Sequence, residues 1–269
     1  MIEAVGLTRR YGKQVVVDSI NLNIPAGAFY GFLGPNGAGK STTIRMLTGA
    51  LAPTSGAVRI DGIDPAHDPL AVKRRIGVMA EEPVLYEKLT AAEFLEFAGR
   101  MHGLSQPEAI ARANDLIDLL DLAPARDRLI ADYSMGMKKK TALAAALIHR
   151  PRVLFLDEPF NGMDTFAVQA ISSLLRQMTE NGATVFFSSH IMATVEKLCT
   201  RVSILTRGRI VAEGTLADLR SRSHSAADAT LEQVFISLTD AGAQLPLPTW
   251  LQTQHRGTSH SGPETTSQR

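Results

Sequence analysis

The feature that most constrains this chain is a glycine-rich segment at residues 34–41. It fits the pattern G-x-x-x-x-G-K-[ST], in which glycines allow consecutive backbone N–H groups to surround phosphate oxygens. The apolar run Phe29–Leu33 before it predicts a strand, and Thr42–Leu51 after it predicts a helix whose N-terminus adds positive potential. This order predicts a phosphate-binding loop in an α/β fold. The loop comprises Gly34, Pro35, Asn36, Gly37, Ala38, Gly39, Lys40 and Ser41.

The polar residues at the end of this loop indicate which ligand it holds. We expect Lys40 to reach the β- and γ-phosphates of a nucleotide, and the Ser41 hydroxyl to ligate Mg²⁺. Thr42, the next residue, is expected to belong to the same site. The alternative, a glycine-rich turn with a surface lysine, leaves the flanking strand and helix unexplained.

A second constellation follows the apolar run Val153–Leu156, which ends in Asp157 and Glu158. A buried strand delivers its C-terminal residues to the ligand crevice of an α/β sheet. We expect Asp157 to hold Mg²⁺ directly or through water, and Glu158 to act as general base for an attacking water. A solvated acidic pair is the better interpretation of such a strand end alone. The upstream phosphate loop reverses that preference.

His190 follows a third predicted strand, Thr184–Phe187, and the pair Ser188-Ser189. From that position it is expected to contact the γ-phosphate and orient the attacking water. Most histidines in such a place are hydrogen-bonded loop residues without a catalytic role. For His190 we favour a functional role, because it follows a predicted strand as Glu158 does.

The pattern of predicted elements changes along the chain. Short strands are expected in residues 1–30, helices between about residues 88 and 148, and strands again from Val153 onward. The sequences Thr90–Glu93 and Ser105–Glu108 both fit a capping box, which marks a helix start. Alternation of strands and helices favours a mostly parallel sheet with crossover helices.

Composition excludes several classes of protein. Lys and Arg total 28 against 27 Asp and Glu, so nothing biases the chain toward nucleic acid or anionic lipid. The one cysteine, Cys199, excludes an internal disulfide, and the apolar run 142–148 is too short to cross a membrane. Residues 252–269 contain no aliphatic or aromatic hydrophobic residue, no alanine, no methionine and no cysteine. The end of the chain is therefore expected to be disordered.

With these residues in place, residues 1 to about 240 resemble the ATP-binding subunit of an ABC transporter. Tyr133–Lys138 stands where that family has its L-S-G-G-Q signature, and Asn161–Asp164 looks like its D-loop. Tyr11 matches the aromatic residue that stacks on adenine, and His190 the switch histidine. The resemblance implies an α/β P-loop NTPase with a mostly parallel core, an N-terminal antiparallel β subdomain and a helical signature subdomain over about 88–148. A largely disordered tail, 241–269, is expected to follow the cassette, 1–240.

The resemblance also implies a mechanism with ATP and Mg²⁺ as cofactors. In this family two cassettes pair head to tail, and each ATP lies between one phosphate loop and the partner's signature. Ser134 and Gly136 would then contact the partner's nucleotide, as would Asp164 of the D-loop. Lys138–Lys140 are interpreted as a solvated basic face rather than as added positive potential near the nucleotide.

Three residues depart from the family pattern. Met135 replaces the first signature glycine, Met137 replaces the glutamine, and Glu81 stands where the family has the Q-loop glutamine. A carboxylate at residue 81 can still contact nucleotide and bind Mg²⁺, although it adds negative charge beside phosphates. Similar replacements occur among exporter-type cassettes, so ATP hydrolysis is still expected, with Glu158 as its base.

The segment Leu231–Thr239 resembles the L-E-[ED]-V-F-x-x-L-T ending of cassettes that serve ABC-2-type permeases, which are often exporters. A generic amphipathic end helix is the alternative. The resemblance implies a cytoplasmic motor, bound to the inner face of the membrane through a separate permease that selects the substrate. Docking is expected near the groove beside the helical insert, around residues 81–90.

Two further points stay open at this level. The second cassette can be an identical chain or a different one. A non-transport ABC ATPase acting on ribosomes or DNA is the alternative function, although such relatives usually carry tandem cassettes or coiled-coil insertions. Here there is one phosphate loop and one signature, and no nucleic-acid partner is expected.

Overall fold

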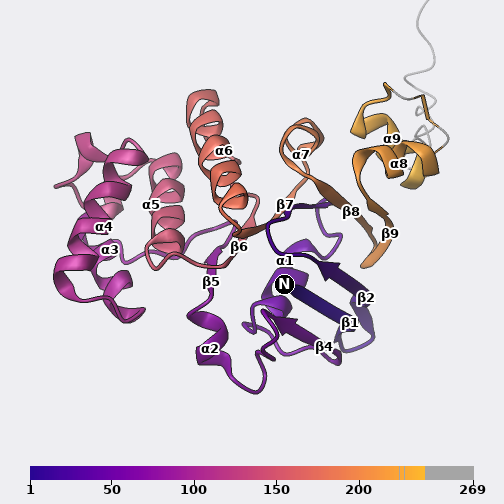
Figure 1. Cartoon of the computed structure of the whole chain (residues 1–269), viewed down its shortest axis with the longest axis horizontal. Coiled ribbons are helices and arrows are strands. Elements are labelled where there is room, and N and C mark those ends of the chain that lie inside the picture. The colour runs from indigo at the N-terminus through magenta and orange to yellow at the C-terminus, as the bar shows by residue number, and fades with distance from the viewer. Residues whose placement is uncertain (224, 227, 240–269) are drawn as a thin grey trace, which may run out of the picture.

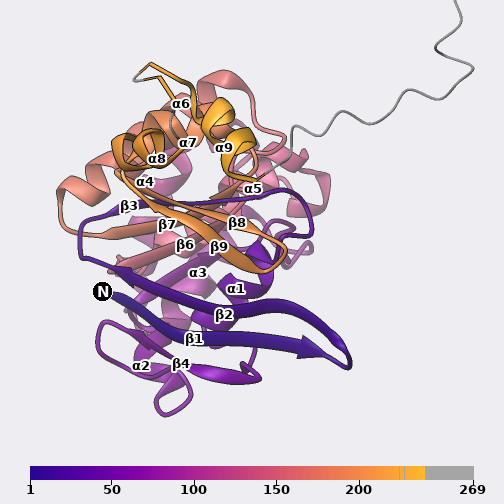
Figure 2. The same ribbon diagram turned by 90° about the vertical axis from the view of Figure 1, so that its right-hand side faces the viewer.

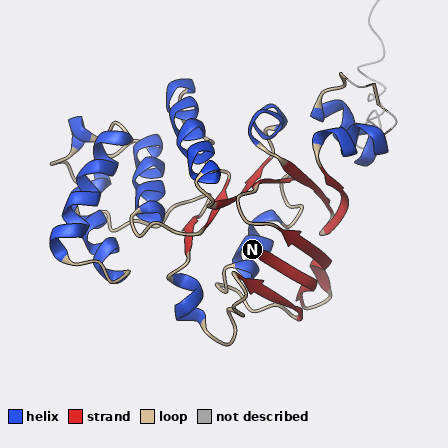
Figure 3. Ribbon diagram, in the orientation of Figure 1, coloured by secondary structure: helices blue, strands red, loops and turns tan. Residues whose placement is uncertain are grey.

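A six-stranded sheet in the middle of the molecule carries the loops that form the site (Figures 1 and 3). The computed structural model describes residues 1–223, 225–226 and 228–239, so the expected tail lies outside the described residues. The strand order is β5-β6-β7-β3-β8-β9; all neighbours pair in parallel except β8 and β9. The bounds are β3 Phe29–Leu33, β5 Ile76–Met79, β6 Val153–Asp157, β7 Thr184–Ser189, β8 Arg201–Thr206 and β9 Arg209–Gly214.

The central strands are buried along their whole length. Every residue of β3, β6 and β7 is buried, because helices cover the sheet on both faces. Their carboxyl ends lie at one edge, where Asp157 pairs with Ser188 and Leu33 with Ser189. This edge therefore brings the ends of three strands together.

The N-terminal strands form a separate antiparallel sheet of order β2-β1-β4, as predicted. It comprises β1 Ile2–Tyr11, β2 Gln14–Ile24 and β4 Ser55–Ile60. Helix α1 (Lys40–Leu47) contacts β2 and β4 of this sheet and β6 of the other, so it lies between the two sheets (Figure 2). The helix was expected to reach Leu51, but it ends earlier because Gly49 adopts a left-handed φ of 74°.

The helices expected between residues 88 and 148 are present as α3 (Ala91–Met101), α4 (Gln106–Leu119) and α5 (Met135–Leu147). Thr90 forms the predicted capping box with Glu93. The second predicted box was wrong, because Ser105 makes no side-chain cap hydrogen bond. Glu108 instead pairs with Arg112 one turn later, at 2.6 Å.

The remaining helices cover the sheet and its far edge. Among them, α9 buries Leu231, Val234 and Phe235, the apolar stripe that its sequence predicts. Cys199 lies directly after α7 and packs its Sγ against Gly31 of β3. The bounds are α2 Pro69–Lys73, α6 Thr165–Glu180, α7 Met192–Leu198, α8 Leu216–Arg222 and α9 Leu231–Thr239, with short 3₁₀ turns at Ala123–Ala125 and Ile130–Asp132.

None of the helices within the described ranges has both the length and the apolar character needed to cross a membrane.

Candidate nucleotide-binding site

The phosphate loop follows β3, and two of its three glycines are packed too tightly to be replaced. A Cβ on Gly34 would lie 2.5 Å from the carbonyl oxygen of Leu205. A Cβ on Gly39 would lie 2.8 Å from the carbonyl oxygen of Val16, and its φ of 108° also excludes most side chains. The loop is therefore held between the two sheets.

Two backbone hydrogen bonds fix the shape of the loop. The Ala38 N–H donates to the Pro35 carbonyl at 3.1 Å, and the Ala38 carbonyl accepts from Gly208 at 2.9 Å. Pro35, Asn36 and Gly37 are exposed, whereas Ala38 and the following two residues are buried. The loop thus presents a solvent-facing rim on a rigid base.

Lys40, the first residue of α1, is buried and folds back over the loop. Its Nζ donates to the Gly34 carbonyl at 2.9 Å and to the Pro35 carbonyl at 3.4 Å. The same Nζ lies 3.2 Å from Oε1 of Glu158. Ser41 and Thr42 follow in the first turn and are half-buried. The phosphate loop and the end of β6 therefore meet at Lys40.

Asp157 and Glu158 are both buried at the end of β6. The Ser188 hydroxyl donates to Oδ1 of Asp157, and the Glu158 N–H donates to Oγ of Ser188 at 3.1 Å. Glu158 adopts a φ of 46°, which is unusual for a residue with a long side chain. Ser188 joins the two acidic residues; the sequence singled it out only as part of the pair before His190.

His190 lies beside Glu158, as its place after β7 suggested. Its Nδ1 is 3.0 Å from Oε2 of Glu158, and its backbone N–H donates to the same oxygen at 3.4 Å. The structure thus brings Lys40, Glu158 and His190 together. The Glu158 carboxylate, itself 3% exposed, lies between a lysine and a half-exposed imidazole.

The other predicted site residues lie on the surface around this cluster. Tyr11 ends β1 and is 48% exposed, with the Arg9 guanidinium 4.6 Å from its ring centroid. Glu81 is exposed after β5. Asp164 is the exposed N-cap of α6, and hydrogen bonds from backbone N–H groups, above all that of Ala167, lower the pKa of its carboxyl.

The signature segment forms the exposed start of α5. Ser134 caps the helix by accepting the Met137 N–H at 3.3 Å, and Met135 is 57% exposed. The buried Tyr133 anchors the segment, because its hydroxyl donates to the Ala125 carbonyl at 2.8 Å. A Cβ on Gly136 would meet only ordinary contacts at 3.4 Å and beyond. Among the residues that the structure describes, none comes close enough to require a glycine there.

The interpretation of Lys138–Lys140 as a solvated face was wrong for Lys139. That residue is 3% exposed, and its Nζ donates to the Glu158 carbonyl at 3.0 Å. Lys138 pairs with Glu87 at 2.6 Å instead. The signal for Lys139 was its helical spacing, three and four residues before the buried Ala142 and Leu143.

The donor set fits Mg²⁺ that arrives with a nucleotide. Within the described parts of the chain, no group of three or more His, Cys, Asp or Glu side chains could hold a metal by itself. Mg²⁺ is commonly bound through one or two protein oxygens together with phosphates and water. The Ser41 hydroxyl and the Asp157 carboxylate supply such hard oxygens next to the loop.

Comparison with known proteins agrees with this geometry. A family model described as "ABC transporter" matches residues 17–161. The chain is also 41% identical over 220 residues to the daunorubicin/doxorubicin resistance ATP-binding protein DrrA of Streptomyces peucetius, covering 82% of this chain and 67% of that protein. The chain belongs to the ABC transporter family.

Solved cassettes have the same fold as this ABC transporter subunit. The ATP-binding subunit of an ABC transporter superposes with a TM-score of 0.84 at 34% identity, covering 89% of this chain and 99% of the other. A dimeric cassette bound to ADP and Pi in a post-hydrolysis state superposes with a TM-score of 0.75 at 26% identity, covering 80% and 99%. The chain is thus an ATP-binding and ATP-hydrolysing cassette, and cassettes of this family work as dimers with membrane permeases.

Proposed function

We propose that this cassette hydrolyses ATP at Glu158 and drives a separate ABC-2-type permease that exports its substrate. The observation that carries the catalytic part is the buried Glu158 carboxylate between Lys40 and His190. The export direction is supported by the similarity to a resistance protein and by the ending Leu231–Thr239.

Binding of ATP begins at the exposed rim of the phosphate loop. Tyr11 stacks on the adenine, and the backbone N–H groups of the loop surround the phosphates. Lys40 exchanges the carbonyls of Gly34 and Pro35 for the β- and γ-phosphate oxygens. This exchange is favourable because a full anionic charge replaces two carbonyl dipoles.

The Mg²⁺ site is proposed from the donors beside the loop. Ser41, Asp157 and Glu81 supply the oxygen ligands, directly or through water. Mg²⁺ bound with the nucleotide neutralises phosphate charge. Ser188 holds Asp157 in place by donating to its Oδ1, and Thr42 lies next to this donor set in the first turn of α1.

Glu158 acts as general base in the hydrolytic step. The water oxygen forms a bond to the γ-phosphorus, while the bond from that phosphorus to the β–γ bridging oxygen breaks. The water proton passes to the Glu158 carboxylate, and the electron pair of the broken bond stays on ADP. His190, 3.0 Å from Oε2 of Glu158, orients the carboxylate and contacts the γ-phosphate.

Ser134, Gly136 and Asp164 act across the dimer interface. Ser134 and the first turn of α5 present a hydroxyl and N–H groups to the ATP held by the partner's phosphate loop. Such a contact needs an exposed helix start, and Ser134 and Met135 are exposed. The partner cassette is an identical or a related chain, and bound ATP joins the two.

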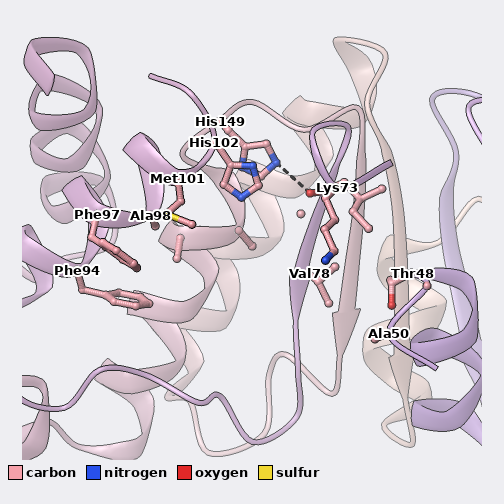
Figure 4. A pocket seen from close by; sticks show the side chains of 15 residues that line it. Thr48, Ala50, Lys73, Val78, Phe94, Phe97, Ala98, Met101, His102 and His149 are labelled. Carbon is pink, nitrogen blue, oxygen red and sulfur yellow. Dashed lines mark hydrogen bonds between the residues drawn. The ribbon is translucent and has the colours of Figure 1, made fainter. Parts of the chain in front are cut away.

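The permease docks in the groove between the sheet and the helical subdomain (Figure 4). A cavity of about 510 Å³ is lined there by β5 and by α3 and α5. Val78, Phe97 and Met101 expose 43–72% of their surface at this place. An apolar groove of this kind fits a short amphipathic helix of a membrane protein. Docked on such a permease, the cassette would work at the cytoplasmic face of the membrane.

The catalytic proposal is tested by Glu158→Gln. Glutamine keeps the shape of the side chain but cannot accept the proton at neutral pH, so turnover should fall at least about a hundredfold, with ATP affinity retained. Wild-type turnover in a purified variant would contradict the proposal. His67→Gln, a change at an exposed residue away from the site, is the matched control.

The partner is tested by mild extraction of native membranes and purification of this chain. A stoichiometric polytopic membrane protein of the ABC-2 type is the expected companion. Ribosomal particles or nucleic acid without a membrane protein would instead support the alternative function.

A further inference from the structure

Two lysines are buried among the described residues, Lys40 and Lys139, and both contact Glu158. Lys40 holds the carboxylate from the phosphate loop. Lys139 holds the backbone carbonyl of the same residue from helix α5, at 3.0 Å. The expected roles of the loop account for Lys40, but no motif assigned to the site accounts for Lys139.

We propose that Lys139 is a positioning residue that holds the backbone of Glu158 and links the helix beginning at Ser134 to the catalytic carboxylate. This inference rests on the proposed role of Glu158 as general base. In this proposal Lys139 contacts neither the substrate nor the reacting atoms. It acts through the conformation of Glu158.

The backbone of Glu158 needs such support. A φ of 46° is unfavourable for a residue with a Cβ, and it persists only where the surroundings fix it. Ser188 accepts the Glu158 N–H on one side, and Lys139 donates to the Glu158 carbonyl on the other. The Asn161 N–H also donates to this carbonyl, at the longer distance of 3.4 Å. Without Lys139 the buried carbonyl keeps only this weaker hydrogen bond, which is costly in the protein interior. The direction of the carboxylate then changes with the backbone.

Charge also favours a lysine at this place. Burial lowers the pKa of Lys139, and the carboxylates of Glu81, Glu158 and Asp157 oppose that shift, with Glu81 contributing most. Lys139 therefore balances three acidic groups at this edge of the sheet, including the Glu81 that replaces the family's glutamine. Its Nζ can donate to the carbonyl whether it is charged or neutral.

The position of Lys139 on α5 gives the contact a second consequence. Ser134 caps this helix, and Lys139 lies little more than one turn further along it. Figure 1 shows α5 at the boundary between the helical subdomain and the sheet. Because a helix moves as a rigid element, contact of Ser134 with the partner's ATP fixes where Lys139 holds Glu158. Engagement of one nucleotide would thereby prepare hydrolysis of the other.

The test compares Lys139→Met and Lys139→Arg in the full-length chain. Lys139→Met keeps the length of the side chain and removes the donor, so kcat should fall about tenfold, with KM for ATP within about twofold. Lys139→Arg keeps a donor and should recover part of kcat. Lys197→Met, which changes an exposed lysine in the last turn of α7, is the matched control and should leave kcat and KM nearly unchanged.

Unchanged kcat in folded Lys139→Met would overturn the inference. A joint loss of ATP affinity and thermal stability, with no separate loss of kcat, would also overturn it, because it indicates a purely structural lysine. If Lys139→Met does not fold, Lys139→Leu, which also lacks a donor, takes its place with the same expectations. Normal turnover in Glu158→Gln would instead show that the underlying proposal fails.

The link to Ser134 is tested by a double-mutant cycle on kcat with Ser134→Ala and Lys139→Met. If the two residues act through one helix, the double variant should lose little more than the more impaired single variant. Independent, multiplicative losses would overturn the link.

Discussion

The phosphate loop and the start of α5 are both glycine-containing helix N-termini, but different neighbours hold them. Gly34 and Gly39 are pressed against carbonyl oxygens of this same chain, at 2.5 and 2.8 Å from where a Cβ would be. Gly136 has room for a Cβ at ordinary distances, and Met135 beside it faces solvent. The fold of the monomer therefore accounts for the glycines of one region only. Under the proposed function, the partner's nucleotide sets the requirement for a glycine at residue 136.

The largest expected effect comes from a substitution in the tightly packed phosphate loop. Gly34→Ala places a methyl group against the Leu205 carbonyl, and overpacking of this kind costs about 1–3 kcal/mol of stability. We expect a lower free energy of unfolding and loss of ATP binding, because the loop must move to admit the methyl group. Denaturant unfolding and nucleotide titration measure the two effects. An unchanged ATP affinity would show that the loop tolerates the shift.

The matched change in the open region separates folding from function. Gly136→Ala should change the free energy of unfolding by less than about 1 kcal/mol and leave ATP binding to the single chain intact. ATP-dependent dimer formation and turnover should both fall, because the proposed function places the partner's nucleotide beside this methyl group. Sedimentation with and without ATP, using Glu158→Gln to slow hydrolysis, measures this. A dimer as strong as that of Glu158→Gln alone would contradict the comparison.

The smallest expected effect concerns His149, which lies just beyond the C-terminal end of α5 in a position where the surrounding fold sets its pKa. Burial, reinforced by the ring of His102 stacked at 3.6 Å, lowers the pKa of His149 to about 4. The unfolded chain takes up a proton there near pH 6.5 and the folded chain does not, so the free energy of unfolding falls as the pH drops from about 6.5 toward 4. Thermal unfolding should show a Tm decrease at pH 5 that is about 2–4 °C smaller in His149→Gln. Equal decreases in both proteins would refute this.

The strands and the phosphate loop were predictable because their signals are local. The apolar runs of β3, β6 and β7 are buried on both faces, and the loop motif specifies its own backbone. In contrast, β5 has only four residues and contains Gly77, so its own sequence is a weak signal for a strand. Its pairing with β6 is what makes it one. The Ser105 box failed because an exposed helix start can satisfy its N–H groups with water.

Long-range contacts explain what the sequence did not reveal about the site. Three consecutive lysines suggest a solvated surface, but Lys139 is buried and contacts Glu158 in the turn that follows β6. The left-handed backbone of Glu158 is likewise set by partners from β7 and α5, which lie 30 and 19 residues away in the chain. Residue types and spacing predicted which side chains meet, but not which backbone they stabilise.

The packing of Cys199 against Gly31 makes this chain a convenient host for site-directed chemistry. It is the one cysteine of the sequence, and burial raises the pKa of its thiol, so it reacts slowly with maleimides and disulfides. A cysteine introduced at an exposed position away from the proposed dimer contact, such as His67, would then be the dominant reactive thiol. Spin labels, fluorophores or crosslinkers placed there can report the distance between two cassettes during a turnover cycle, without first removing a native cysteine.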